Sequence, residues 1–246
     1  MNYEQGYFTF DGVSSKDFGV FINGNKTFNS PQRIVTMQTI PGRNGELVVD
    51  EGRYGNMEHS YAAFIFKDFK PNVSGLANYL STKVGYHRLE DSYHPDEFYH
   101  AMFVAGLDVD AGSELDVGVF TLTFNRKPQR FLKSGERVVV FERPNNTSGT
   151  ISRTIFNPTR QVSAPLIRVY GTGTVGVGNM TIQVTSNPGY IDLDCDMEDA
   201  FMESTNCNGN IKMLSDDFPT LQPGNTGIAL GSGITKIEIT PRWWRL

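Results

Sequence analysis

The chain has 246 residues, of which 39% are hydrophobic and 20% charged, and its formal net charge is −5. These proportions are those of a folded chain, and the length fits one large all-β domain or two ordinary ones. The acidic balance and the lack of a dense basic run argue against a dedicated nucleic-acid-binding protein. No basic head followed by an apolar core begins the chain, and no run of eighteen apolar residues occurs, so we expect neither a signal peptide nor a membrane span.

Short alternating segments dominate the chain and predict β-strands. Residues 34–40, 118–124 and 179–184 alternate apolar and polar side chains at the period of two that is typical of half-buried strands. Clusters rich in glycine and asparagine separate such segments and predict turns. Asn44 and Gly45 predict a two-residue hairpin turn of type I′, because this dipeptide accepts the positive φ angles that the turn needs.

One segment has clear helical periodicity. Residues 71–83 place Leu76, Tyr79 and Leu80 on one face of a predicted helix. A domain boundary is predicted near residues 127–134, where an apolar strand ends in a basic segment that contains a proline. The sequence therefore predicts two β-rich domains, and the first carries the helix.

Three histidines raise the question of a metal site. His87, His94 and His100 lie near several acidic residues, but zinc sites usually have tighter ligand spacing. Pro95 interrupts the segment, and the aromatic residues on either side predict two strands that flank a turn. We expect these histidines in turn and strand-end positions, with no metal bound.

Residues 171–176 match the G-x-G-x-x-G pattern of dinucleotide-binding loops. Such a loop needs a helix that starts directly after it, so that the amide dipoles meet the pyrophosphate. Residues 177–184 continue with a β pattern instead. We therefore expect a hairpin here, and no nucleotide site or other cofactor site.

An acidic strand is the most conspicuous polar feature of the second half. Alternation over residues 190–199 predicts four side chains toward the core and three carboxylates on the other face, namely Ile191, Leu193, Cys195 and Met197 against Asp192, Asp194 and Asp196. Like charges two residues apart on one strand face are roughly 7 Å apart and repel each other. Three arrangements stay open: solvated charges, ion pairs with Lys or Arg of a neighbouring strand or subunit, or a bound cation such as calcium.

The sequence has few other features that indicate chemistry. It lacks a Gly-x-Ser-x-Gly motif and any recognised triad, so we expect no enzyme activity. Cys195 and Cys207 are interpreted as buried, reduced thiols. Trp243 and Trp244 are neighbours on a strand and face opposite ways, so we expect one in the core. The other is expected against a neighbouring domain, a subunit or a ligand, with a sugar-stacking platform as the functional alternative.

Several motifs, taken together, point to a known family. They occupy residues 10–15, 18–20, 40–47 and 124–132 in the first half, and residues 157–159, 163–173 and 217–226 in the second. The order of these motifs and the residues in them resemble those of the distal tail proteins of long-tailed, non-contractile bacteriophages. The likeness covers nearly the whole chain.

The resemblance implies a mainly β structural virion protein of two domains. Residues 1–130 would form a ring-forming, tail-tube-like domain of sandwich or barrel-like architecture with one short helix. Residues 131–246 would form a galectin-like or carbohydrate-module-like β-sandwich of the jelly-roll kind. Six copies would close into a ring at the tail tip, after synthesis in the cytoplasm of the bacterial host.

The resemblance also implies partners. They are further copies of the chain, the major tail tube protein, the tail-tip hub or tail-associated lysin, and a receptor-binding protein. DNA would pass through the channel without specific binding, and no membrane partner is expected. The candidate subunit-interface hairpin spans residues 41–55, because exposed hairpins supply complementary patches for a closing ring. Its tip consists of Gly42, Arg43, Asn44, Gly45 and Glu46.

Three alternatives to this interpretation stay open. The hairpin is also compatible with an ordinary surface element. The chain as a whole is also compatible with a carbohydrate-binding β-sandwich module fused to a second β domain, although it lacks a clustered His-Asn-Arg-Trp site of the galectin kind. A hydrolase with carboxylates on a sandwich face is the third possibility.

Overall fold

The computed structural model describes residues 5–23, 29–66, 68–111, 118–186 and 188–246. The chain divides into two compact units, which we call the first unit (Met1–Arg130 with Leu246) and the second unit (Phe131–Arg245). Each has its own hydrophobic core. Strands dominate both units, and one α-helix occurs among the described residues. The predicted mainly β fold with a helix in the first half is confirmed.

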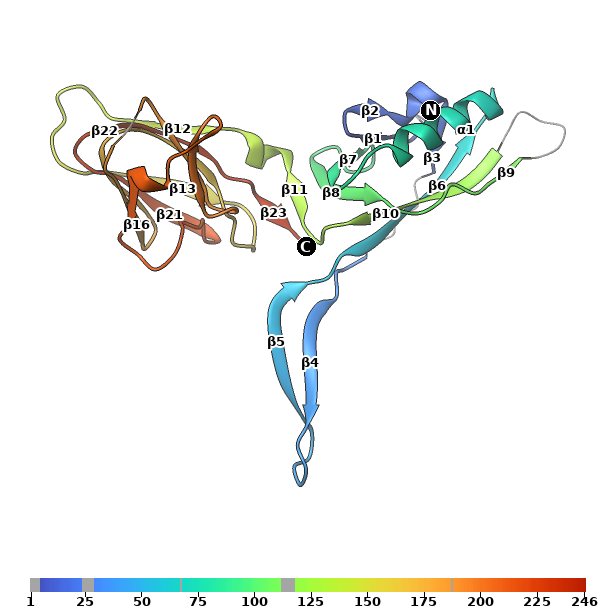
Figure 1. The fold of residues 1–246 in the computed structure, drawn as a ribbon, viewed down its shortest axis with the longest axis horizontal. Helices are drawn as coiled ribbons and strands as arrows, with labels where there is room; N and C mark the ends of the chain where they lie inside the picture. Colours follow the sequence, from blue (N-terminus) through green and yellow to red (C-terminus); the bar gives the residue numbers. More distant parts are fainter. Residues whose placement is uncertain (1–4, 24–28, 67, 112–117, 187) are drawn as a thin grey trace. The chain divides into compact units, whose positions relative to one another are not determined.

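The first unit is built around an antiparallel sheet (Figure 1). Its strands are β1 (Phe8–Phe10), β2 (Val13–Ser14), β3 (Val20–Ile22), β4 (Arg33–Thr39), β5 (Glu46–Tyr54), β6 (Met57–Ile65), β7 (His87–Asp91), β8 (Glu97–Phe103), β9 (Val109–Ala111) and β10 (Gly118–Arg126). A 3-10 helix spans Ser15–Phe18. The main sheet has the order β2-β1-β7-β8-β10-β6-β3, with β9 paired to β10, while β4 and β5 form a separate two-stranded sheet.

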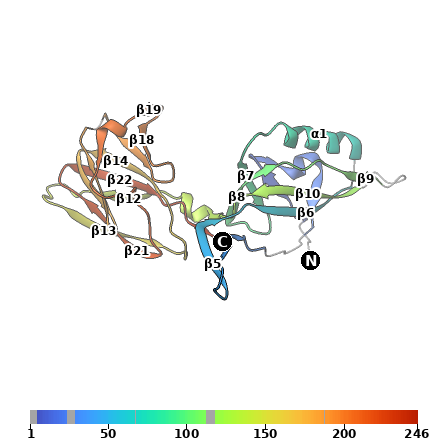
Figure 2. The ribbon, with the colours of Figure 1, turned by 60° about the horizontal axis from the view of Figure 1, so that its bottom comes forward.

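Helix α1 (Phe69–Ser81) covers one face of the main sheet (Figure 2). Leu76 and Leu80 lie one turn apart on its inner face and are buried. Pro71 stands in the first turn, where its missing N–H removes no helical hydrogen bond. The helix therefore begins two residues before the predicted segment 71–83, and it also ends two residues earlier.

Aromatic side chains form much of the core of the first unit. Phe8 stacks on Tyr61 with ring centroids 5.7 Å apart, and Phe10 lies 5.2 Å from Phe124. Phe8 also meets Phe124 edge to face at 5.7 Å. Offset and edge contacts of this kind stabilise aromatic cores beyond their buried area. Three-residue strands such as β1 can therefore be anchored by one or two rings.

The second unit is a β-sandwich. Its strands are β11 (Arg130–Leu132, beginning one residue before the unit), β12 (Val139–Glu142), β13 (Ile151–Asn157), β14 (Leu166–Gly171), β15 (Gly173–Val177), β16 (Met180–Val184), β17 (Ile191–Asp194), β18 (Asp199–Met202), β19 (Thr205–Asn206), β20 (Ile211–Met213), β21 (Gly224–Leu230), β22 (Ile234–Thr240) and β23 (Trp244–Arg245), and its 3-10 helices are Lys133–Glu136 and Asn208–Asn210. One sheet has the order β12-β22-β14-β17-β18-β19 and the other β13-β21-β15-β16-β20. Their inner faces share a single core.

Ile167 on β14 lies at the centre of that core. It pairs with Leu193 and Ile239 in the neighbouring strands and is 0% exposed. Ile167→Ala is expected to lower the free energy of unfolding of the second unit by about 2–4 kcal/mol, because it leaves a cavity. Urea unfolding followed by circular dichroism measures the loss. Leu166→Ala, on the opposite and half-buried face, is the control and should cost clearly less. Equal losses in the two variants would contradict the assigned faces.

Candidate assembly surfaces and a cationic pocket

The candidate interface hairpin is the β4–β5 ribbon. The two strands pair with each other, from Arg33 opposite Tyr54 to Thr39 opposite Glu46, and with no other described strand (Figure 1). The connection between them spans residues 40–45 and carries four of the candidate tip residues, while the fifth, Glu46, begins β5. Residues 41–50 are all exposed. The structure thus places every candidate tip residue at an accessible position.

The turn at the tip differs from the predicted type I′ turn at Asn44 and Gly45. The N–H of Arg43 donates to the carbonyl oxygen three residues earlier at 3.2 Å, with Pro41 and Gly42 at the central positions. Gly42 has φ 79°, which fits a type II turn, and Asn44 is not among the described residues with positive φ. The type I′ prediction is wrong, because Pro41 pre-sets its own φ for an earlier turn.

Both faces of the hairpin expose aliphatic side chains. Directly paired residues share a face, so Val35, Met37 and Val48 lie on one face and Leu47 and Val49 on the other. Met37 and Val48 are each 53% exposed. A two-stranded hairpin is marginally stable alone in water, and contiguous exposed apolar surface is typical of interaction sites. The hairpin has the properties of a surface that a partner covers.

Charged residues organise the base of the hairpin. Arg33 contacts Asp50 at 2.5 Å, and the N–H of Gly52 donates to Asp50 at 2.8 Å. The Gly52 N–H bond, followed by the Arg33 contact, holds the pKa of Asp50 below its ordinary value. Gly52 has φ 70° where the pairing register shifts, as expected of a β-bulge. These contacts fix the register of the two strands. Because exposed ion pairs contribute little to stability, they do not replace the tertiary packing that the hairpin lacks.

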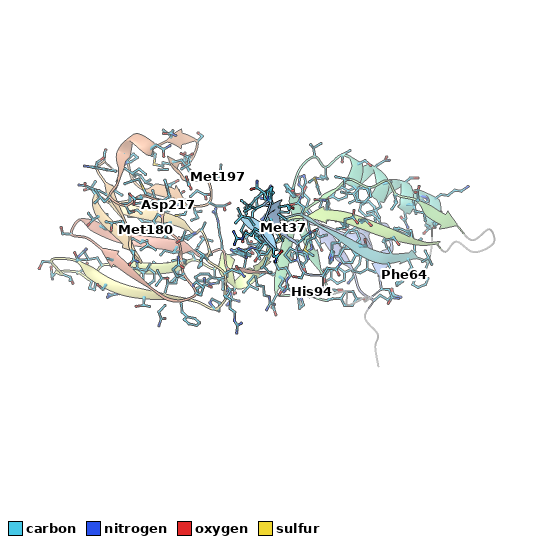
Figure 3. All side chains as sticks on the ribbon, turned by 90° about the horizontal axis from the view of Figure 1, so that it is seen from below. Met37, Phe64, His94, Met180, Met197 and Asp217 are labelled. Atoms are coloured by element: carbon cyan, nitrogen blue, oxygen red, sulfur yellow. The ribbon has the colours of Figure 1, made fainter. Side chains whose placement is uncertain are left out.

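A second apolar surface lies on the main sheet, on the face opposite α1. We call it the aromatic patch, and it consists of Phe21, Phe64, Phe66 and Val119. The ring centroids of Phe21 and Phe64 are 6.0 Å apart and those of Phe64 and Phe66 are 4.9 Å apart. Phe66 is 52% exposed and Val119, which pairs with Phe64, is 66% exposed. Figure 3 shows Phe64 on the side of the first unit away from the helix.

The first unit also contains a polar pocket of about 200 Å³. Its lining residues are mostly hydrogen-bond donors: Asn29, Ser30, His59, His94, Tyr99, Arg126, Arg130 and Leu246. Arg126 is 4% exposed, and its guanidinium lies 4.5 Å from the centroid of the Tyr99 ring. Burial lowers the pKa of Arg126. The pocket therefore holds a desolvated cation.

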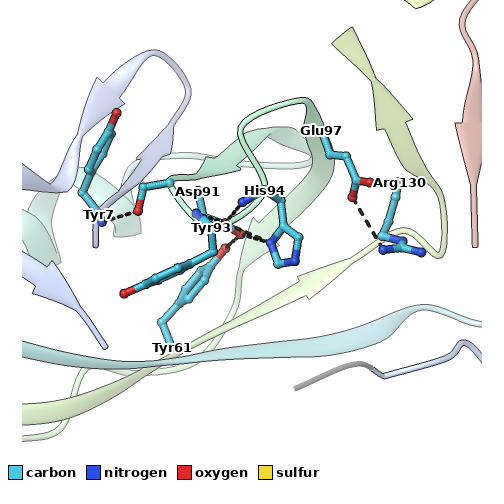
Figure 4. Close-up of polar contacts among 8 residues, drawn as sticks. Tyr7, Tyr61, Asp91, Tyr93, His94, Glu97 and Arg130 are labelled. Carbon is cyan, nitrogen blue, oxygen red and sulfur yellow. Dashed lines mark hydrogen bonds and ion pairs between the residues drawn. The ribbon is translucent and has the colours of Figure 1, made fainter. Parts of the chain in front are cut away.

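Two carboxylates near this pocket already have partners (Figure 4). Asp91 is buried and accepts hydrogen bonds from Tyr61 Oη at 3.0 Å, from the Tyr93 N–H at 2.9 Å, and from His94. Glu97 is buried as well and forms an ion pair with Arg130 at 3.6 Å. Neither carboxylate lines the pocket itself.

Two of the three histidines noted in the sequence occupy the predicted turn and strand-end positions, whereas His100 lies in the middle of a strand. His87 begins β7, His94 lies in the turn and His100 lies on β8. His87 Nδ1 is 3.2 Å from Asp11, and His94 pairs with Asp91 at 3.0 Å. Among the described residues, no group of three or more His, Cys, Asp or Glu side chains is arranged to hold a metal ion.

His59 gives the pocket a measurable pH dependence. Burial, followed by the charge of Arg126, lowers the pKa of His59 from 6.5 to about 4, against the opposing effect of Asp91; His94 lowers it further. The unfolded chain therefore binds a proton at His59 below about pH 6.5, whereas the folded chain binds that proton only below about pH 4. Relative to His59→Gln, the wild type should lose about 2–3 kcal/mol of unfolding free energy between pH 7.5 and 4.5. Urea unfolding in chloride buffers measures this difference, and parallel pH profiles of the two proteins would contradict it.

Two aspartates of the acidic strand in the second unit form ion pairs with arginines. Asp192 receives two hydrogen bonds from Arg168, at 2.7 and 2.8 Å, and Asp194 receives two from Arg242 at the same distances. Both aspartates are buried, at 4% and 6% exposure. Of the three arrangements left open by the sequence, the structure shows pairing with arginines of the same chain for these two residues.

The predicted alternation fails after Asp194. Strand β17 ends there, and a turn follows in which Glu198 has φ 53°. Asp196 and Met197 are consequently exposed, with Met197 at 72%. The prediction that Met197 is buried is wrong, because backbone N–H groups of residues 196 and 197 turn back onto the Asp194 carboxylate.

The G-x-G-x-x-G match lies on strands, and it leads from the end of β14 in one sheet into β15 in the other, so the predicted hairpin turn follows the match instead of lying within it. Residues 173–177 are strand β15, which pairs with β16. Gly171 has φ 94°, and a Cβ there would approach the carbonyl oxygen of Gly233 to 2.1 Å. The glycine is thus required by close backbone packing between strands.

The two tryptophans have different environments. Trp243 is buried in the core of the second unit, whereas Trp244 is half-buried and donates its indole N–H to the Val162 carbonyl at 2.9 Å.

Cys195 and Cys207 are free and buried, and burial raises the pKa of Cys195 to about 12. No helix in the described part of the chain is long and apolar enough to cross a bilayer.

Sequence reasoning missed the pocket. Arg126 lies on β10, where Phe120, Leu122 and Phe124 face inward at alternate positions. Arg126 continues that inward series. Alternation therefore predicts a buried side chain at this position, and an arginine there was the feature that could have indicated the pocket. His59 lies on the neighbouring strand β6 and shares no local sequence pattern with it.

Comparisons with known proteins agree with this architecture at the level of the fold. No protein-family model matches the chain, and no curated protein matches it. The crystal structure of the Dit protein of phage SPP1, described as a paradigm of the hub adsorption apparatus in phages that infect Gram-positive bacteria, matches with a TM-score of 0.72 and 16% identity, over 99% of this chain and 100% of that one. A chain of the phage p2 baseplate in its activated, strontium-containing form matches with a TM-score of 0.46 and 11% identity, over 98% of each chain.

The whole-length match defines the class of fold. The chain has the two-part, mainly β fold of a phage Dit protein. Its likeness to the SPP1 protein in particular extends from end to end of both chains.

Proposed function

We propose that the chain is a structural component of a phage tail tip, where six copies form a ring between the tail tube and the tail-tip hub. The observation that supports this most is the match to the SPP1 Dit protein over the full length of both chains. It covers both units and not one common β module. On this proposal the first unit builds the ring and the second is available to anchor host-recognition components.

The first unit offers the surfaces that a ring requires. A closed head-to-tail ring needs two different complementary patches on each subunit. The β4–β5 hairpin and the aromatic patch are two such surfaces, and both expose apolar side chains. The overall charge of −5 is also favourable for a channel through which DNA moves without adhering.

The carbohydrate-binding alternative lacks a comparable supporting observation. On the outer face of the β14-containing sheet, Arg168 pairs with Asp192 and lies 4.1 Å from the Tyr190 ring centroid. Lys236 pairs with Glu238 at 2.7 Å. These four charged side chains are engaged with one another and are not free to bind a sugar hydroxyl.

Location in the virion tests the proposal. Gold-labelled antibodies against the chain should bind the distal end of the tail in electron micrographs of particles from a host that carries this gene. Antibodies against a capsid protein are the control. Label on the capsid, or along the whole tail tube, would contradict a tail-tip role.

A further inference from the structure

Arg126 is a buried cation with very few hydrogen-bond partners. Its residue is 4% exposed, its Nε has no partner, and Nη1 donates only to the Lys127 carbonyl at 3.4 Å. A guanidinium stays charged and offers five donors. The nearby carboxylates of Glu97 and Asp91 pair with Arg130 and His94. The Leu246 oxygen in the pocket accepts from Arg130 and not from Arg126. Because a buried charge with so few acceptors is costly, a further acceptor beside Arg126 would stabilise the site.

The pocket beside Arg126 has the size and chemistry for that acceptor. It measures about 200 Å³, and neither aspartate nor glutamate lines it. His59 contributes Nε2, which is buried without a partner. Arg130 contributes a second guanidinium, which already pairs with Glu97 and donates to the Leu246 oxygen. Asn29 and Ser30 add amide and hydroxyl donors at the rim.

We propose that this pocket binds a single oxyanion group, held by the fork of Arg126 with support from Arg130 and His59. The planar guanidinium matches carboxylate and phosphate oxygens in a bidentate manner. The anion is either a free phosphate-like ion or a carboxylate side chain from a second copy of the chain. The proposal does not depend on the tail-tip role.

Inorganic phosphate is the first probe. The full chain is titrated with sodium phosphate at constant ionic strength, set with sodium chloride, and the melting temperature and calorimetric heat are recorded. We expect saturable binding that Arg126→Gln weakens at least tenfold. Arg126→Lys keeps the charge but loses the fork, so it should weaken binding several-fold. Arg160→Gln, an exposed arginine in the second unit, is the matched control and should bind as the wild type does.

A histidine signal distinguishes binding in the pocket from a general salt effect. The His59 ring lies near Arg126, Asp91 and His94, and burial, followed by the charge of Arg126, lowers its pKa to about 4. Phosphate beside it should move the midpoint of its NMR titration upward, and His59→Gln identifies the resonance. A phosphate response that is unsaturable and equal in Arg126→Gln would overturn the proposal.

Assembly distinguishes the two sources of the anion. If a carboxylate of a second copy occupies the pocket, phosphate should dissociate the oligomer and Arg126→Gln should reduce its mass. If a free anion occupies it, oligomer mass should be unaffected while the melting temperature responds. A wild type that shows neither response overturns the proposal. Should Arg126→Gln fail to fold, Arg126→Lys and the wild-type titration give the same decision.

Discussion

Met37→Asp is expected to abolish self-assembly while the chain stays folded. Met37 is 53% exposed on the hairpin, so the free chain should lose little stability. In an assembled ring the same position would be desolvated, and a buried charge without a partner costs several kcal/mol. Every subunit interface of a closed ring carries this cost, so we expect almost no assembly of the variant.

Light scattering coupled to size exclusion measures the result, and circular dichroism checks the fold. Met197→Asp is the matched control, because Met197 is 72% exposed and lies on a turn of the second unit. Figure 3 labels both positions. The control should assemble as the wild type does. Normal assembly of Met37→Asp would exclude the hairpin from the interface.

Arg242→Gln is expected to destabilise the second unit by about 3 kcal/mol. Asp194 is 6% exposed, and the change removes both hydrogen bonds from Arg242. Breaking a buried pair typically costs 3–5 kcal/mol. The partial exposure of Arg242 and the two backbone N–H groups that still donate to Asp194 favour the lower end. Urea unfolding at pH 7 measures the loss. Arg153→Gln, an exposed arginine of the same unit, should have little effect.

The same ion pair should respond to acid. The hydrogen bonds from Arg242 hold the pKa of Asp194 below its ordinary value. A depressed carboxyl pKa stabilises the folded state above the unfolded pKa of about 3.9, and this stabilisation is lost as pH falls through the folded pKa. The difference between wild type and Arg242→Gln should therefore be full at pH 7 and shrink below pH 4. In an Asp194→Asn background Arg242→Gln should cost much less, and an unchanged cost would contradict the pairing.

The sequence predicted the elements whose pattern is local. Alternation over residues 118–124 predicted β10, and helical spacing of Leu76 and Leu80 predicted α1. The turn at the hairpin tip was misassigned, because two competing turn signals lie within five residues and the proline prevails. A local pattern predicts that a helix or strand is present more reliably than it predicts the residues at which that element begins and ends.

Pairings between distant residues were beyond such patterns. Arg242 is 48 positions from Asp194 in the chain, so nothing in the acidic segment indicated which cation would meet it. The pocket is a similar case, since Arg126 and His59 are brought together by the pairing of β10 with β6. Sheet register brings Arg126 and His59 together, whereas the segment between β22 and β23 brings Arg242 to Asp194.

Ring symmetry tests the central proposal most directly. Negative-stain images of the purified full chain, alone or with its hub partner, should give class averages with six-fold symmetry and an open centre. Met197→Asp should form the same rings, and Met37→Asp should form none. Monomers or two-fold dimers in every preparation of the wild type would contradict the proposed ring.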